Sequence, residues 1–216
     1  MNVQEIFSQK NHSIENTFLN KYIEVFRFMT PTNTAEYKFT ERNLTVNFAT
    51  AIKKAFSSAV CWYEFPYKIM PNNHTNQHID AVMIVPKEKI VFVCEAKRNF
   101  PQKDIKTLKD DIRRIIDFPS VIHREHLMNT IHNPDSYTYI GVLLLDAWKA
   151  KGRLSASNLA LWEKCDLGIE KLRVPISIED NYYERSLYFD EFDSEIKNEI
   201  IAKKYTIKII AWELER

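Results

Sequence analysis

Two short apolar runs, residues 79–85 and 90–96, stand out in the pattern of hydrophobic and polar positions along the chain. Both are rich in β-branched and aliphatic residues, and a polar tetrapeptide at 86–89 separates them, which predicts two antiparallel strands joined by a tight turn. Side chains of a strand alternate between its faces, and both faces of the second run are apolar until its end. Such strands are usually central and covered on both sides, so we expect this hairpin in the middle of a sheet.

Apolar residues at helical spacing predict amphipathic helices on either side of this hairpin in the sequence. Further apolar runs predict additional strands, one of them with Pro66 near its end. The expected helices cover residues 13–29, 40–58, 102–117, 155–165 and 194–204, and the expected strands cover 60–69, 137–145, 173–178 and 205–214. Residues 118–136 are expected to form a loop with a short helix. This order of elements predicts an α/β protein with a central mixed sheet flanked by helices.

Length and charge limit the possible organisation of the chain. With 216 residues, 45% hydrophobic content and three glycines, it is long enough for one sizeable core. We expect a single domain over residues 1–216, with its core at about 40–146 and with the helix at 13–29 and the elements at 155–216 as additions. The formal net charge is +1. Such a charge creates no global basic field, so any surface for nucleic acid has to be local.

The cysteines bear on the compartment in which the protein works. Cys61, Cys94 and Cys165 are odd in number and lack C-x-x-C spacing, which is typical of a reducing compartment without a disulfide framework. The first residues do not resemble a signal peptide, and no apolar stretch approaches the length of a membrane span. We therefore expect a soluble cytoplasmic protein without a membrane partner.

Three charged residues, Asp80, Glu95 and Lys97, interrupt the apolar strands of the predicted hairpin. Ionised groups at the end of a covered strand are costly unless something pairs them, so a bound cation or a compensating partner is implied. A hairpin that turns near Lys87 brings the surroundings of Asp80 level with the far end of the second strand. Carboxylate oxygens suit a hard cation such as Mg²⁺, which takes one or two protein carboxylates alongside phosphate oxygens.

The spacing of these charges resembles a known signature. Asp80, fourteen intervening residues and then Glu95-Ala96-Lys97 are similar to the active-site motif of the PD-(D/E)XK nuclease superfamily, which has the restriction-endonuclease-like fold. Ile79 stands where that family often has proline. The resemblance covers about residues 40–146. It implies an α-β-β-β-α-β core and hydrolysis of phosphodiester bonds with Mg²⁺, for which Mn²⁺ substitutes.

The resemblance also implies a role for each matching residue. Asp80 and Glu95 would hold one or two Mg²⁺ ions together with the Ala96 carbonyl, and Lys97 would orient the attacking water and offset charge on the phosphorane. Family members often carry a glutamate on the helix before the first core strand, and Glu41 is the matching position. The other interpretation of Glu41 is that it complements the helix dipole in the first turn.

Basic residues follow the proposed catalytic lysine, where a phosphate backbone would have to pass. His78 lies near Asp80 in the sequence and is a candidate for contact with phosphate or water, or for a supporting or surface role. The alternative for the helix at 102–117 is an ordinary solvated face, because aspartates at 104, 110, 111 and 117 interleave with its cations. The candidates for nucleic-acid contacts are Arg98, Lys103, Lys106, Lys109, Arg113 and His78.

These observations lead to one expected function and two alternatives. We expect a metal-dependent nuclease, with DNA rather than RNA as the substrate, acting as an endonuclease in restriction, defence or repair. A cut through a duplex needs two sites, so a homodimer is consistent with this expectation. The alternatives are a non-catalytic nuclease-fold module that binds nucleic acid or a protein partner, and a structural ion cluster in which Lys97 neutralises a buried acid.

Overall fold

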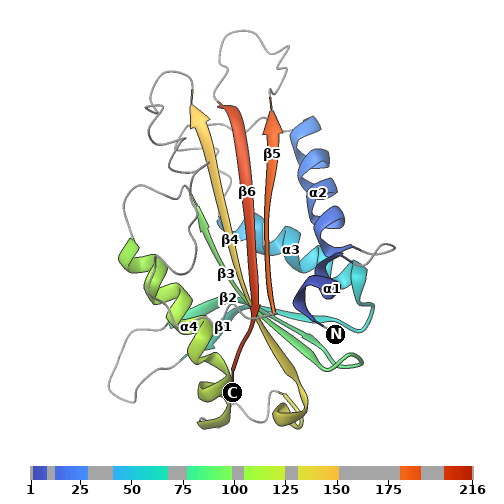
Figure 1. Cartoon of the computed structure of the whole chain (residues 1–216), viewed down its shortest axis with the longest axis vertical. Helices are drawn as coiled ribbons and strands as arrows, with labels where there is room; N and C mark the ends of the chain where they lie inside the picture. The colour runs from blue at the N-terminus through green and yellow to red at the C-terminus, as the bar shows by residue number, and fades with distance from the viewer. Residues whose placement is uncertain are drawn as a thin grey trace.

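A six-stranded mixed sheet forms the centre of the computed structural model, which describes residues 2–8, 13–28, 41–67, 77–98, 105–124, 131–150, 181–190 and 202–215 (Figure 1). The strand order is β1-β2-β3-β4-β6-β5, in which β3 and β4 are parallel and the other neighbours are antiparallel. The strands are β1 (Val60–Tyr67), β2 (Gln77–Val85), β3 (Ile90–Arg98), β4 (Thr138–Ala150), β5 (Tyr182–Asp190) and β6 (Ala202–Glu213).

Helices cover both faces of this sheet. Figure 1 shows α1 (Val3–Ser8), α2 (Ile14–Phe28) and α3 (Glu41–Ala55) on one side and α4 (Ile105–Arg124) on the other. Alternate side chains of β3 therefore enter two different cores, with Phe92 packing toward α1–α3 and Val93 toward α4. A short 3₁₀ helix, η2 (Pro134–Ser136), precedes β4. The described helices do not combine the length and the apolar character that crossing a bilayer requires.

The α/β class and the central hairpin agree with the sequence-based prediction. The β2–β3 pair is antiparallel, and both of its neighbours in the sheet, β1 and β4, flank it as a central pair requires. Gly141 on β4 permits close packing between layers, because a Cβ atom there would lie 2.6 Å from Ile115 of α4 and 2.9 Å from Trp212 of β6. The order α3-β1-β2-β3-α4-β4 is the α-β-β-β-α-β order expected from the sequence.

Several predicted boundaries were wrong. Helix α4 continues through Pro119 to Arg124, although it was predicted to end at residue 117, before a loop with a short helix over 118–136. The burial of Phe118 against Phe65 favours this continuation. The helix predicted at 194–204 is wrong at its end, because Ala202 already pairs with Ala150 in the sheet. Helix α1 and strand β5 were not predicted. The elements predicted at 155–165 and 173–178 lie outside the described residues.

Candidate active site at the open end of the hairpin

The hairpin between β2 and β3 opens where its charged residues begin. The paired positions of β2 and β3 run from Val85 opposite Ile90 to Ala81 opposite Cys94. Beyond them, β2 remains paired with β1 as far as Gln77, while β3 remains paired with β4 as far as Arg98. The two strands therefore separate at the level of Asp80 and Glu95, each following its outer neighbour.

A local kink turns Asp80 out of the regular alternation of β2. Ile79 and Val82 both enter the core beneath α4, although they are three residues apart, while Ala81 enters the opposite core. Regular alternation would place residues 79 and 82 on opposite faces, so the strand changes phase between them. On the neighbouring strand the residue at the same level, Glu64, has a left-handed backbone with φ 53°. Both strands are thus distorted at the level of Asp80.

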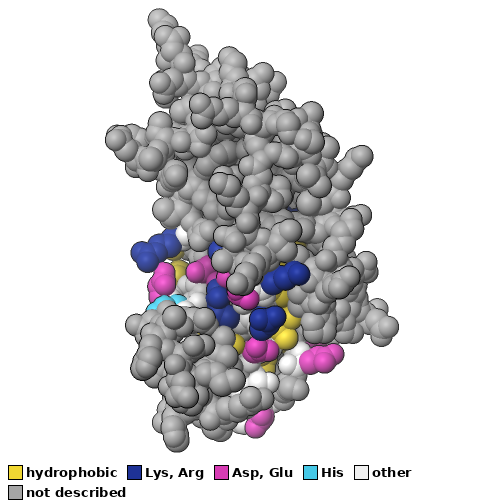
Figure 2. Space-filling model, turned by 90° about the vertical axis from the view of Figure 1, so that its left-hand side faces the viewer, with side chains coloured by type: hydrophobic (Ala, Val, Ile, Leu, Met, Phe, Trp, Pro, Cys, Tyr) yellow, Lys and Arg dark blue, Asp and Glu magenta, His cyan; other side chains and the backbone are white. Residues whose placement is uncertain are grey.

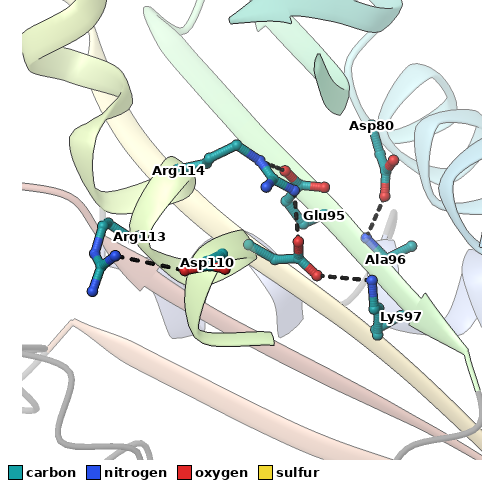
Figure 3. Close-up of polar contacts among 8 residues, drawn as sticks. Asp80, Glu95, Ala96, Lys97, Asp110, Arg113 and Arg114 are labelled. Carbon is teal, nitrogen blue, oxygen red and sulfur yellow. Dashed lines mark hydrogen bonds and ion pairs between the residues drawn. The ribbon is translucent and has the colours of Figure 1, made fainter. Parts of the chain in front are cut away.

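The carboxylate of Asp80 replaces a missing backbone partner of β3. The Ala96 N–H donates to Asp80 Oδ2 over 2.7 Å (Figure 3). In a strand the N–H and C=O of one residue point to the same side, so the Ala96 carbonyl also points toward the gap that β2 leaves. Partly exposed Asp80 lines a pocket of about 230 Å³ on the α3 side, so this carboxylate is reachable from outside. The other lining residues are Arg42, Thr45, Val46, Tyr63 and Glu64.

Glu95 points to the opposite side of β3, toward α4. It is only 2% exposed, and Arg114 Nε donates to its Oε1 over 2.9 Å. Burial raises the pKa of the Glu95 carboxyl well above its ordinary value, and the negative charge of Asp80 raises it further, whereas Arg114 acts in the other direction. The charge of Asp80 thus acts on the pKa of Glu95, although Asp80 lies toward α3 and Glu95 lies toward α4.

A second acid, Asp111 of α4, completes an ion cluster beneath the helix. Its Oδ1 accepts from Arg114 Nη2 over 2.6 Å, and its Oδ2 lies 3.2 Å from the Lys97 ammonium. Glu95, Arg114, Asp111 and Lys97 therefore form a continuous chain of ion pairs between β3 and α4. Figure 2 shows acidic and basic side chains gathered on the side of the molecule that α4 covers.

The structure brings some of the predicted site residues together and separates others. Glu95 and Lys97 lie on the α4 side of β3, and Asp80 lies toward α3. The Ala96 side chain belongs to the core on the α1–α3 side, and its N–H contacts Asp80. In the described ranges no group of three His, Cys, Asp or Glu side chains lies close enough to form a metal cluster. His78 is exposed, and its Nδ1 lies 3.2 Å from the Glu64 carbonyl oxygen.

The predicted accessory residues are placed only in part. Glu41 is the first residue of α3, but its side chain is outside the described residues, as are the side chains of Arg98 and Lys106 and the whole of Lys103. Lys109 is partly buried on α4. Arg113 is exposed and pairs with Asp110 over 3.6 Å, as the solvated-face interpretation of this helix predicts.

Two residues of the cluster were missed as site residues. Arg114 was not among the candidates named from the sequence, and Asp111 was counted only as one acid of a solvated helix face. Their spacing from the apolar positions carried the missing signal, because Asp111 follows Leu108 by three residues and precedes Ile115 by four, which places it on the buried side of a helix.

Comparisons of the chain with protein-family models, with curated proteins and with solved structures gave no significant match.

Proposed function

We propose that the protein is a metal-dependent nuclease with a restriction-endonuclease-like core, and that the open end of the β2–β3 hairpin is its active site. The observation that carries the proposal is the parting of β2 from β3 at Asp80 and Glu95, with Lys97 two residues further on. Three antiparallel strands followed by a helix and a parallel strand are also the arrangement that the sequence resemblance implies. Neither the separation of the two strands nor the order of elements depends on the net charge of the chain, which is only +1.

The acids around the opening are of the type that binds a divalent cation. Asp80, Glu95 and Asp111 bring three carboxylates to this region, together with the two bases Lys97 and Arg114. Burial is the main cause of the raised pKa of Glu95, and the negative charge of Asp80 adds to it. A divalent ion would reduce the repulsion between the Asp80 and Glu95 carboxylates and would attract a phosphodiester anion.

In this proposal Asp80, Glu95 and the Ala96 carbonyl hold Mg²⁺, for which Mn²⁺ substitutes. The bound ion would lower the pKa of a water molecule and reduce charge build-up on the phosphate. Lys97 holds an ammonium group at the end of β3, where it donates to the attacking water or to a phosphate oxygen. Arg114 already holds Glu95 in the structure, so binding of the cation competes with this ion pair.

The substrate in this proposal is DNA rather than RNA, cut by an endonuclease with 5′-phosphate and 3′-hydroxyl products. The pocket beside Asp80 offers the substrate strand an approach, because the exposed Arg42 and Tyr63 side chains are among its lining residues. A homodimer in the cytoplasm would place two such sites on one duplex.

The test is cleavage of plasmid and single-stranded DNA by the wild type, Asp80→Asn and Lys97→Met, in Mg²⁺, Mn²⁺ and EDTA. We expect cleavage in either metal, none in EDTA, and a loss of about 100- to 1,000-fold in each variant, because each removes a charge that stabilises the transition state. Asp110→Asn, which changes an exposed acid of α4, is the control and keeps full activity. Cleavage that persists in EDTA or in Asp80→Asn contradicts the proposal.

The ion cluster itself favours a second candidate, a nuclease-fold module that cuts nothing. Lys97 and Glu95 both have protein partners in the structure, as a purely structural cluster requires. Calorimetry distinguishes the two, because a structural module has no need for Mg²⁺. Binding of Mg²⁺ that disappears in Asp80→Asn supports the nuclease, and its absence in the wild type supports the module.

A further inference from the structure

Asp111 is the only described acid that joins both cations of the cluster beneath α4, since its two oxygens serve different partners. Oδ1 accepts from Arg114 over 2.6 Å, and Oδ2 lies 3.2 Å from Lys97 Nζ. The Asp111 side chain is 7% exposed, so water contributes little to its solvation. A buried carboxylate is stable only when its oxygens are paired, and here the pairs fix where both cations lie.

A second aspartate–arginine pair on the same helix has the same spacing and a different setting. Asp110 and Arg113 lie 3.6 Å apart, with side chains 47% and 68% exposed. Figure 3 shows Arg114 directed at Glu95, whereas Arg113 and Asp110 lie farther from β3. Exposed pairs of this kind are worth little and hold nothing in place. Adjacent positions of α4 thus carry a buried ion pair, Asp111–Arg114, and a solvated one, Asp110–Arg113.

We infer that Asp111 is a positioning residue for the proposed hydrolysis: it fixes the ammonium of Lys97 and, through Arg114, the carboxylate of Glu95. This inference rests on the proposed function. Lysine is a flexible side chain with a point charge, so an ammonium that must meet one water or phosphate oxygen needs an anchor. Arginine is a planar fork, and Arg114 uses Nε for Glu95 and Nη2 for Asp111. A shift of the Asp111 carboxylate would therefore move the Lys97 ammonium and the Glu95 carboxylate together.

A merely structural role for Asp111 would consist of attaching α4 to β3. Such a role changes the stability of the fold but leaves turnover by the folded molecules unchanged. The experiments therefore measure turnover for each folded molecule and, separately, the surroundings of Lys97.

The first experiment observes Lys97 without metal or substrate. Lysines are dimethylated reductively with ¹³C-formaldehyde, and the Lys97 methyl resonance is identified by its absence in Lys97→Arg. In EDTA we expect Asp111→Asn to move this resonance and Asp110→Asn to leave it in place. A Lys97 resonance that is unchanged in Asp111→Asn overturns the inference.

The second experiment is steady-state cleavage of an oligonucleotide in Mg²⁺, with the folded fraction of each protein taken from its thermal unfolding curve. We expect Asp111→Asn to lower kcat about 10- to 100-fold with little change in KM, as loss of a supporting residue commonly does. Asp110→Asn keeps the wild-type kcat. Arg114→Lys retains the charge without the fork and serves if Asp111→Asn does not fold, with an expected loss of about tenfold.

The outcomes separate this inference from the proposed function. A wild type that cuts nothing in Mg²⁺ contradicts the nuclease proposal itself. An active wild type accompanied by an equally active, folded Asp111→Asn or Arg114→Lys contradicts only the positioning role.

Discussion

The two halves of the β2–β3 hairpin differ in how their backbone is paired: the half next to the turn has regular strand pairing, and the other half does not. Next to the turn, strand pairing is regular from Val85 to Ala81, and side chains such as Met83 and Phe92 are fully buried. At the other end β2 leaves β3, and a side chain, Asp80, accepts the N–H of Ala96. The comparison teaches that the closed half buries apolar side chains, while the open half holds charged groups at a defined place.

The largest expected effect on stability lies in the closed half. Met83→Ala removes a fully buried side chain, so we expect the free energy of unfolding to fall by about 2–5 kcal/mol. Cleavage by the remaining folded molecules stays at the wild-type level. Urea unfolding and cleavage assays measure the two quantities, and Val60→Ala, at a position 59% exposed on β1, is the stability control. A folded Met83→Ala protein without activity would show that the halves are not separable.

A smaller effect, dependent on pH, is expected in the open half. The pKa of Glu95 is raised in the folded protein, so between the ordinary glutamate range and that raised value the folded state binds a proton that the unfolded state has lost. The stability of the wild type in EDTA should therefore fall as pH rises through this window. Glu95→Gln removes this dependence, because its amide does not titrate.

Asp80→Asn sharpens the same measurement. The charge of Asp80 contributes to the raised pKa of Glu95, so this variant should show a shallower fall in stability with pH than the wild type. Thermal unfolding at a series of pH values measures both variants. A slope in Asp80→Asn equal to that of the wild type would mean that the charge of Asp80 does not act on Glu95.

The closed half was predictable from the sequence, and the open half only in outline. Alternating apolar runs and a polar turn are local signals, and they located β2 and β3 within two residues of their ends. The kink at Asp80 has no such signal, because its left-handed partner position on β1 is occupied by Glu64 rather than glycine. The predicted pairing partners of the charges were also incomplete, because they depend on how α4 docks on β3.

Strand β5 illustrates the same limit elsewhere in the sheet. Its sequence mixes polar and aromatic residues, so no single face marks it as a strand. Its place follows from distant partners, since Glu184 pairs with the buried Lys208 of β6 and Tyr183 donates to Glu15 of α2. Contacts between residues far apart in the chain stabilise this strand, and the local sequence pattern does not reveal such contacts.

The smallest expected effect on stability comes from two residues with a left-handed backbone, Lys89 in the turn and Glu64 beside Asp80. Lys89 ends the turn with φ 56°, and its side chain is exposed. Its backbone carbonyl accepts a hydrogen bond from the Thr138 N–H, which a change of side chain leaves in place. Lys89→Gly relieves the cost of this conformation, so we expect the free energy of unfolding to rise by up to about 1 kcal/mol.

Glu64→Gly is the matched variant beside Asp80. It relieves the same backbone conformation, φ 53°, but it also removes the ion pair with Arg42, whose partners are 3.2 Å apart and largely exposed. We expect a smaller gain than in Lys89→Gly, since such a pair contributes about 0–1 kcal/mol. Urea unfolding of both variants measures the difference. A larger gain at Glu64 than at Lys89 would place the greater backbone strain in the open half, next to the proposed active site.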